Sequence, residues 1–200
     1  MLGRRGFVRA ATALASGGAT TLAGCVEEFG GEADEPPGTA TTTMRSTRFG
    51  TPAFEDGETI PKEYTCAGAD RSPRLEIGDA TGKAESLAVV VVDPDAPSGV
   101  FTHWLLWDVP PDTTTIPKDV PTTETVEDLG GAKQGKNDFG EIGYRGPCPP
   151  KGSDPHTYRF TLYVLERRPR IGAGASRNPL LDELEVLALR TERFTGEFGR

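Results

Sequence analysis

The chain has 200 residues, of which 36% are hydrophobic, and it contains 25 glycines, a composition that suits one packed domain and not a wholly disordered chain. No apolar run approaches the roughly 20 residues that a membrane-spanning helix needs, which argues against an integral membrane protein. With 22 Lys and Arg against 30 Asp and Glu the net charge is −8, and this argues against nucleic-acid binding, which needs clustered cations.

Residues 1–24 have the features of an export signal. Arg4 and Arg5 form a twin-arginine pair, and a mild apolar stretch of Ala, Gly and Thr covers residues 10–24. The stretch ends in Leu-Ala-Gly before Cys25, which resembles a lipobox, where the cysteine is lipidated and becomes the new N-terminus. We therefore predict a twin-arginine signal peptide over 1–24, lipidation of Cys25, and a cell-surface lipoprotein anchored in the membrane by its acyl chains.

Residues 25–45 are predicted to form a disordered tether. They are rich in Glu, Pro and Thr, and they contain too little apolar surface to offset the entropy of ordering the chain. The folded domain is then expected over residues 46–200. Across the chain, six lysines stand against sixteen arginines and the acids dominate. This composition resembles that of proteins from highly saline environments and predicts a halophilic-type acidic surface.

Three strands are predicted within the domain. Residues 87–92 form an unbroken β-branched apolar run, which is typical of a central strand buried on both faces. Residues 103–109 form a second strand candidate. Residues 157–166 form a third, in which apolar and mixed positions alternate between two faces. Long Gly/Pro-rich loops are expected between them, notably over 127–156.

A helix is predicted near the end of the chain. Ser176 or Asn178 could cap it, and Pro179 suits its first turn. The residues that would form its apolar face, and so pack on the sheet, are Leu180, Leu184, Leu187 and Ala188. Together these elements predict a mostly antiparallel β domain with a C-terminal helix.

The chain has only two histidines, and both stand at the ends of predicted strands. His103 opens the second strand, and His156 comes where a Pro-rich loop enters the third. Asp93 ends the first strand and begins a rigid acidic turn that contains Asp95. A lone histidine is more often an ordinary core or surface residue. If these strand ends converge, however, two imidazoles and a carboxylate share one small polar site next to loops that proline makes rigid.

Two motifs around these residues resemble the signatures of the phosphatidylethanolamine-binding protein (PEBP) family. The first is Val92-Asp93-Pro94-Asp95-Ala96-Pro97, followed by His103-Trp104. The second runs over residues 143–152 and continues with His156-Thr157-Tyr158. The resemblance covers residues 46–200 and is strongest to the bacterial and archaeal branch, often called Raf kinase inhibitor-like. Further segments that agree with that branch are 64–68, 134–140 and 174–176.

The resemblance implies a mainly β fold, an antiparallel PEBP-like β-sandwich with peripheral helices, and a small anion-binding pocket. Asp93, His103 and His156 would line the pocket, with Tyr158 and the Gly146-Pro147 loop at its edge. Imidazole N–H groups can donate to a phosphate, and Asp93 could fix a histidine tautomer. The glycine would let backbone N–H groups approach the anion.

Three further residues are expected around the pocket. Asp95 would shape the acidic turn, and Trp104 would form part of the wall together with Tyr158. Arg145 stands where relatives in this branch often have a small residue, so it could add a phosphate contact or narrow the mouth. Thr157 stands where arginine is common, so a phosphate contact from that position is not carried over.

The sequence leaves other interpretations open. Two histidines and an aspartate could bind zinc, but the tight His or Cys spacing of metal sites is absent, and we predict no metal or other cofactor. Cys148 could be a nucleophile beside His156, a small packed residue, or the partner of Cys66 in a disulfide, which an exported setting permits. Residues 130–136 match a P-loop pattern only in part, because Asn137 replaces Ser or Thr and no apolar strand precedes them.

We therefore predict that the protein reversibly binds phosphate-bearing small molecules or phospholipid headgroups, with no catalysis implied. The main alternative is an extracytoplasmic protein-interaction module, because family members are known as inhibitors of kinases or proteases. A kinase partner would be out of reach of an exported protein, whereas a secreted protease would not. A metal-dependent enzyme is a weaker alternative.

Overall fold

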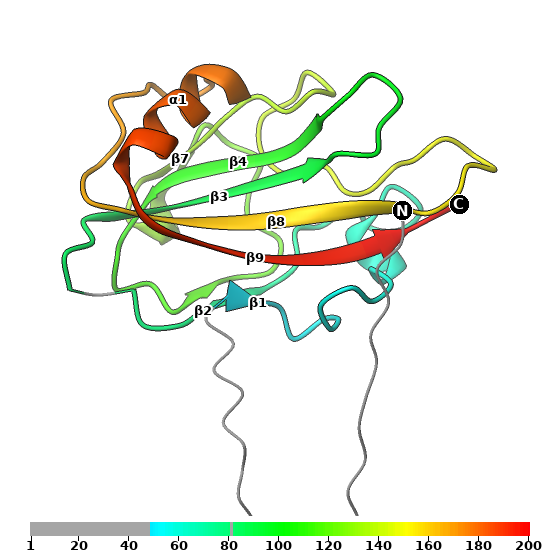
Figure 1. Cartoon of the computed structure of the whole chain (residues 1–200), viewed down its shortest axis with the longest axis horizontal. Coiled ribbons are helices and arrows are strands. Elements are labelled where there is room, and N and C mark those ends of the chain that lie inside the picture. The colour runs from blue at the N-terminus through cyan, green and yellow to red at the C-terminus, as the bar shows by residue number, and fades with distance from the viewer. Residues whose placement is uncertain (1–48, 81) are drawn as a thin grey trace, which may run out of the picture. The chain divides into compact units, whose positions relative to one another are not determined.

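The computed structural model describes residues 49–80 and 82–200. The predicted signal peptide, the lipidation site Cys25, the tether and the first residues of the predicted domain lie outside the described residues. The described residues form two antiparallel sheets, an α-helix and two short 3-10 helices at Lys62–Tyr64 and Glu127–Leu129 (Figure 1).

The two sheets differ in size. The strands of the smaller sheet, in spatial order, are β1 (Phe49–Gly50), β2 (Leu75–Ile77) and β5 (Thr115–Ile116). The strands of the larger sheet, in spatial order, are β6 (Thr125–Val126), β7 (Ala132–Gln134), β4 (Phe101–Val109), β3 (Ser86–Asp93), β8 (His156–Leu165) and β9 (Ala188–Phe198). All neighbouring strands within the two sheets are antiparallel.

The predicted central strand is β3, which lies between β4 and β8 and is buried along its whole length. Its side chains alternate between two apolar clusters. Leu87, Val89 and Val91 belong to a cluster that also contains residues of the smaller sheet. Ala88, Val90 and Val92 belong to a second cluster on the opposite face. Such burial on both faces explains the unbroken β-branched run in the sequence.

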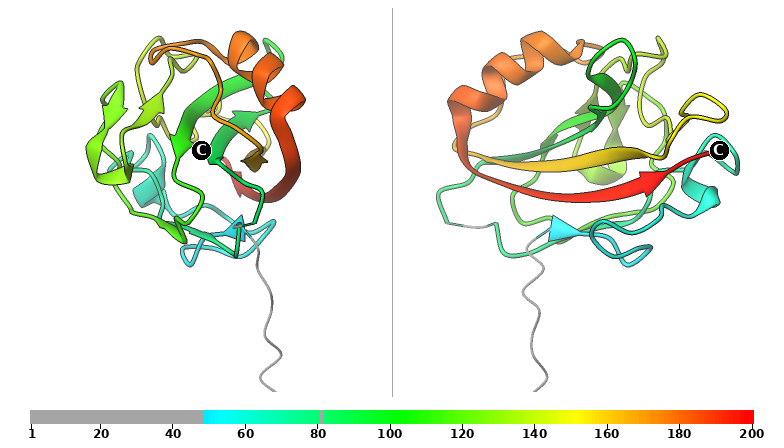
Figure 2. Two further views of the ribbon diagram at one scale, coloured as in Figure 1. Left: turned by 90° about the vertical axis from the view of Figure 1, so that its left-hand side faces the viewer. Right: turned by 45° about the vertical axis from the view of Figure 1, so that its right-hand side comes forward.

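The helix α1 (Arg177–Leu187) covers that second face of the larger sheet. Ser176 stands at its N-cap position, and Leu180, Leu184 and Leu187 are buried against the sheet. Figures 1 and 2 show α1 on one side of the larger sheet and the smaller sheet on the other. The predicted antiparallel β-sandwich with a helix near the C-terminus is therefore confirmed, although Ala188 begins a strand and is not part of the helix.

Six of the nine strands among the described residues were not predicted from the sequence, and β9 and β7 are two of them. β9 follows α1 directly and pairs with β8 along nearly its whole length, from His156 opposite Phe198 to Leu165 opposite Ala188. β7 lies inside the predicted loop region 127–156 and pairs with β4. Within the described part of the chain no helix has the length and apolar character to cross a membrane.

Candidate functional site

Three adjacent strands of the larger sheet bring the predicted polar residues together at one end. Asp93 is the last residue of β3, His156 is the first residue of β8, and His103 lies near the start of β4. Because β3 lies between β4 and β8 and runs antiparallel to both, the end of β3 meets the beginnings of the other two strands. Asp93, His103 and His156 are all buried.

A direct contact joins Asp93 to His156. One carboxylate oxygen of Asp93 lies 2.8 Å from the Nδ1 atom of His156, and the other accepts a hydrogen bond from the Asp95 backbone N–H. Asp95 in turn accepts a hydrogen bond from the Thr157 backbone N–H, which ties the acidic turn to the start of β8. Because an ionised carboxylate only accepts, the His156 proton sits on Nδ1 and leaves Nε2 for another partner.

His103 owes its orientation to an irregularity in β4. Val91 of β3 lies opposite Trp104, whereas Val92 lies opposite Thr102, so His103 is the extra residue of a β-bulge. A bulge changes the direction of side chains locally, and bulges are common near functional sites. Here His103 faces Tyr158, with the two ring centroids 5.2 Å apart and nearly perpendicular.

The backbone of Arg145 holds His103 on two sides. The Arg145 N–H donates to the His103 carbonyl, and the Arg145 carbonyl lies 2.6 Å from the His103 Nδ1 atom. A carbonyl can only accept, so His103 also carries its proton on Nδ1. Burial lowers the pKa of His103 below its usual value, against the opposing effect of the Arg145 carbonyl, and this keeps the ring neutral near pH 7.

Tyr158 contributes a buried hydroxyl to the same cluster. Its side chain is fully buried, and the hydroxyl oxygen makes no hydrogen bond of standard geometry among the described residues. The carboxylate of Asp93 lies close enough to add to the effect of burial, and together they raise the pKa of Tyr158. A buried hydroxyl without a partner costs stability, so this atom is available to a ligand.

The Gly146-Pro147 loop lies beside His103, and its glycine is also held by contacts within the chain. The Gly146 N–H donates to the Asp70 carboxylate at 2.7 Å, so it is already occupied within the chain. A Cβ at this position would overlap the carbonyl oxygen of Tyr64. The absence of a side chain is therefore required by packing between two loops.

The Arg145 side chain is also held within the chain. Its guanidinium pairs with Asp70 at 2.9 Å and with Glu141 at 2.8 Å, and it lies over the ring of Phe139. Phe139 packs in turn against His103, with ring centroids 5.4 Å apart. The sequence interpretation did not single out Asp70, Glu141 or Phe139, because each acts through a partner that is distant in sequence or through backbone atoms.

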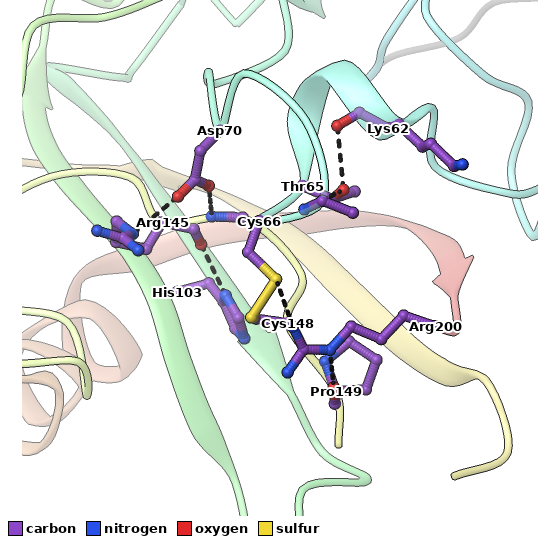
Figure 3. Close-up of a disulfide and its surroundings, with 11 residues drawn as sticks. Lys62, Thr65, Cys66, Asp70, His103, Arg145, Cys148, Pro149 and Arg200 are labelled. Carbon is purple, nitrogen blue, oxygen red and sulfur yellow. Dashed lines mark hydrogen bonds and ion pairs between the residues drawn. A yellow bond between two sulfur atoms is a disulfide. The ribbon is translucent and has the colours of Figure 1, made fainter. Parts of the chain in front are cut away.

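A disulfide fastens the same loop, as Figure 3 shows. Cys66 and Cys148 are bonded, which settles a pairing that the sequence left open and leaves no thiol at Cys148 to act as a nucleophile. Near the bond, Arg200 donates to the Pro149 carbonyl, and the Cys66 N–H donates to the Pro147 carbonyl. The disulfide thus joins the segment after the first 3-10 helix to the loop that orients His103 (Figure 3).

Trp104, which was expected in the pocket wall, is part of the buried core cluster that also contains Tyr158. It is fully buried, its indole N–H donates to the Gln134 side chain at 2.7 Å, and its ring packs edge-on against Tyr144. Gln134 is itself fixed by hydrogen bonds to the carbonyls of Pro121 and Thr123. Trp104 therefore anchors β4, the strand that carries His103, in the core.

The sequence also raised a metal site and a P-loop as alternatives. Across 49–80 and 82–200, no three or more His, Cys, Asp and Glu side chains are grouped so that they could hold a metal ion. The partial P-loop pattern at 130–136 contains strand β7 and does not lead into a helix. A P-loop needs a glycine-rich loop that opens a helix, so this segment is not a nucleotide site.

The fold and the site together define a class: a two-sheet antiparallel β protein with an Asp–His–His cluster where three strands of its larger sheet meet. The family model described as "Phosphatidylethanolamine-binding protein" matches residues 50–199. The chain therefore belongs to the phosphatidylethanolamine-binding protein family.

Individual relatives agree with this assignment. A UPF0098 protein of Pyrococcus horikoshii is 42% identical over 147 residues, covering 74% of this chain and 74% of the relative. A Mycobacterium tuberculosis protein with the name "Putative lipoprotein LppC" is 33% identical over 187 residues, covering 88% of this chain and 89% of the relative. Among solved structures, YbcL of E. coli is similar with a TM-score of 0.70 and 29% identity, covering 76% of this chain and 98% of that one.

Proposed function

We propose that the protein reversibly binds a phosphate-bearing compound, either a small molecule or a phospholipid headgroup, at the Asp93–His103–His156 cluster. One observation carries the proposal: each histidine is fixed through Nδ1, which leaves both Nε2 atoms uncommitted beside the partnerless hydroxyl of Tyr158. Three polar groups without partners in a buried cluster suit a compact ligand rich in oxygen atoms. The name of the family supports the same ligand class.

The residues would act in different ways. Tyr158 would donate its hydroxyl hydrogen to a phosphate oxygen. His103 and His156 would donate from Nε2 after each ring takes up a proton, and charge-assisted bonds of this type are the stronger kind. Asp93 would hold His156 in place and stabilise its positive charge. Gly146 and Pro147 would form the edge of the site, and the Arg145 guanidinium would stay at its rim, bound to Asp70 and Glu141.

The N-terminal features complete the proposal. A twin-arginine signal over residues 1–24 would export the folded protein, and lipidated Cys25 would anchor it at the cell surface, with residues 25–45 as a tether. The similarity to LppC, which is named as a lipoprotein, supports membrane anchoring. The site would then face phosphate compounds outside the cytoplasm. Acidic side chains elsewhere on the chain would repel such ligands mainly in dilute buffer, because salt screens distant charges.

Calorimetric titration tests the binding site. Phosphoethanolamine and glycerol phosphate are titrated into the full chain with Cys25→Ser, which prevents lipidation, and into the same chain with His103→Ala and His156→Ala. Losing two charge-assisted hydrogen bonds should weaken binding by roughly a hundredfold.

Thr157→Ala is the matched control, because Thr157 follows His156 on β8 and its side chain points to the other face of the sheet. The control should bind as the parent chain does. Equal affinity of the parent and the double histidine variant would contradict the proposed site.

A further inference from the structure

The outer face of the last two strands places two arginines side by side. Arg159 lies on β8 opposite Thr195, and Arg193 lies on β9 opposite Thr161. The two arginines are therefore diagonal neighbours on adjacent strands and share one face of the sheet. Diagonal neighbours have Cβ atoms about 7 Å apart, a spacing that two long guanidinium side chains easily bridge.

This face is opposite to the proposed phosphate site. Along β8, His156 and Tyr158 point to the inner face, whereas Thr157 and Arg159 point to the outer face, where Arg159 is partly exposed and Arg193 is exposed. Helix α1 covers the part of the outer face where β8 ends and β9 begins, as Figure 1 shows. Arg159 and Arg193 lie on the outer face next to the part that α1 covers.

The described part of the chain contains no ion pair that involves Arg159 or Arg193, although several other arginines pair with carboxylates on the same chain. Like charges at neighbouring positions of a sheet are destabilising. In a chain with net charge −8, acids are plentiful, and yet no acid among residues 49–80 and 82–200 forms an ion pair with these two side chains. The two guanidiniums therefore keep N–H donors that an anion from outside the chain can accept.

Tyr163 lies on the same face of the sheet as the two arginines. It is buried next to Arg193 on the same face, opposite Thr191. Burial raises the pKa of Tyr163, while the positive charges of Arg193 and Arg159 act in the opposite direction and Glu185 of α1 adds to the increase. A single hydroxyl thus lies within electrostatic reach of both arginines. Two acids stand at the edge of the group: Glu185 of α1, and Glu197, which lies opposite Thr157 on the same face as a diagonal neighbour of Arg159.

We propose that Arg159 and Arg193 form a second anion site, which binds a phosphate group between the two guanidiniums. The planar fork of arginine suits phosphate oxygens, because it can donate two parallel hydrogen bonds to one group. The hydroxyls of Thr161, Thr191 and Thr195 lie at neighbouring positions on the same face and can complete the contacts. The site is independent of the histidine cluster and of the function proposed for it. Its phosphate can belong to a free compound or to an anionic lipid headgroup.

NMR of the arginine side chains tests this site separately from the histidine cluster. The Nε–Hε signals of the full chain with Cys25→Ser are followed while inorganic phosphate is added. They are assigned from a variant with Arg159→Gln and Arg193→Gln. A second variant, with Arg168→Gln and Arg177→Gln, removes the same charge from two arginines that also have no ion pair among the described residues.

The Arg159 and Arg193 signals should move together and saturate with one dissociation constant, while the Arg168 signal moves only weakly and without saturation. Replacing one arginine of the pair should weaken phosphate binding at the other roughly tenfold. Signals of Arg159 and Arg193 that do not move, or that move no more than that of Arg168, would overturn the proposal. The histidine signals report the other site in the same spectra, so failure of one proposal is distinguished from failure of the other.

Vesicle sedimentation identifies the source of the phosphate group. The parent chain and both double variants are mixed with vesicles of phosphatidylglycerol or of phosphatidylcholine. Binding to phosphatidylglycerol that falls in the Arg159/Arg193 variant and not in the Arg168/Arg177 variant assigns the site to anionic lipid headgroups. Equal sedimentation of all three proteins, together with saturating shifts in inorganic phosphate, assigns it to free phosphate compounds.

Discussion

Removing the Cys66–Cys148 disulfide should destabilise the protein by several kcal/mol. The bond joins residues separated by 82 positions, so it closes a long loop in the unfolded chain. The chain-entropy relation gives about 4.5 kcal/mol for a loop of this length at 25 °C, and typical measured effects are about 2–4 kcal/mol. We therefore expect Cys66→Ala with Cys148→Ala to lower the free energy of unfolding by about 2–4 kcal/mol.

Urea denaturation measures this effect, with Cys25→Ser in both proteins so that no other thiol interferes. Two controls accompany it: a thiol count of the unfolded, unreduced parent, and urea denaturation of the reduced parent, which should match the double variant. The loop that holds His103 is also tied by the bonds of Asp70 to Gly146 and Arg145, so the fold should survive. A loss below about 1 kcal/mol, or two free thiols in the parent, would refute this reasoning.

Three further predictions concern single residues of the site. Tyr158→Phe should change the free energy of unfolding by less than about 1 kcal/mol, because the hydroxyl makes no hydrogen bond of standard geometry that could be lost. The same substitution should weaken phosphate binding. A larger loss of stability in urea would mean that the hydroxyl is hydrogen-bonded in the folded protein. Gly146→Ala should lower the free energy of unfolding by about 2 kcal/mol, because the added Cβ would overlap the Tyr64 carbonyl oxygen. Urea denaturation measures this loss. Gly172→Ala is the control and should be nearly neutral, because a Cβ at Gly172 meets no atom within 4 Å. Burial lowers the pKa of His103 below 6.5, so the protein takes up a proton when it unfolds below that pH, and its free energy of unfolding should fall as the pH drops through 6.5. His103→Gln should make this fall smaller. Identical pH profiles of stability for the parent and the variant would contradict the assignment.

The parts of the fold that the sequence predicted are those with a strong local pattern. The continuous apolar run became β3, and the alternating run became β8. Strand β9 escaped prediction because only its second half is buried on one face, while its first half consists of helix-forming and charged residues directly after α1. Its pairing with β8, distant in sequence, decides the conformation.

The features of the site also fall into two groups, those that the sequence predicted and those that it did not. Asp93, His103 and His156 were predicted as a group from their positions at strand ends and from the family motifs. The β-bulge that directs His103 and the Arg145 carbonyl that fixes its tautomer depend on backbone geometry, which side-chain identities do not encode locally. The need for glycine at position 146 is likewise not encoded locally, because it arises where Tyr64 and Asp70 of another loop approach the backbone.

The most direct test of the account is NMR of the two imidazole rings during titration with phosphoethanolamine, glycerol phosphate and then zinc. We predict that His103 and His156 respond together and saturably to a phosphate compound, and that the pKa of His103 rises in the complex, because binding favours the protonated ring. The account is contradicted if neither ring responds to either phosphate compound. It is also contradicted if zinc alone moves both signals, a result that would favour a metal site at the same cluster.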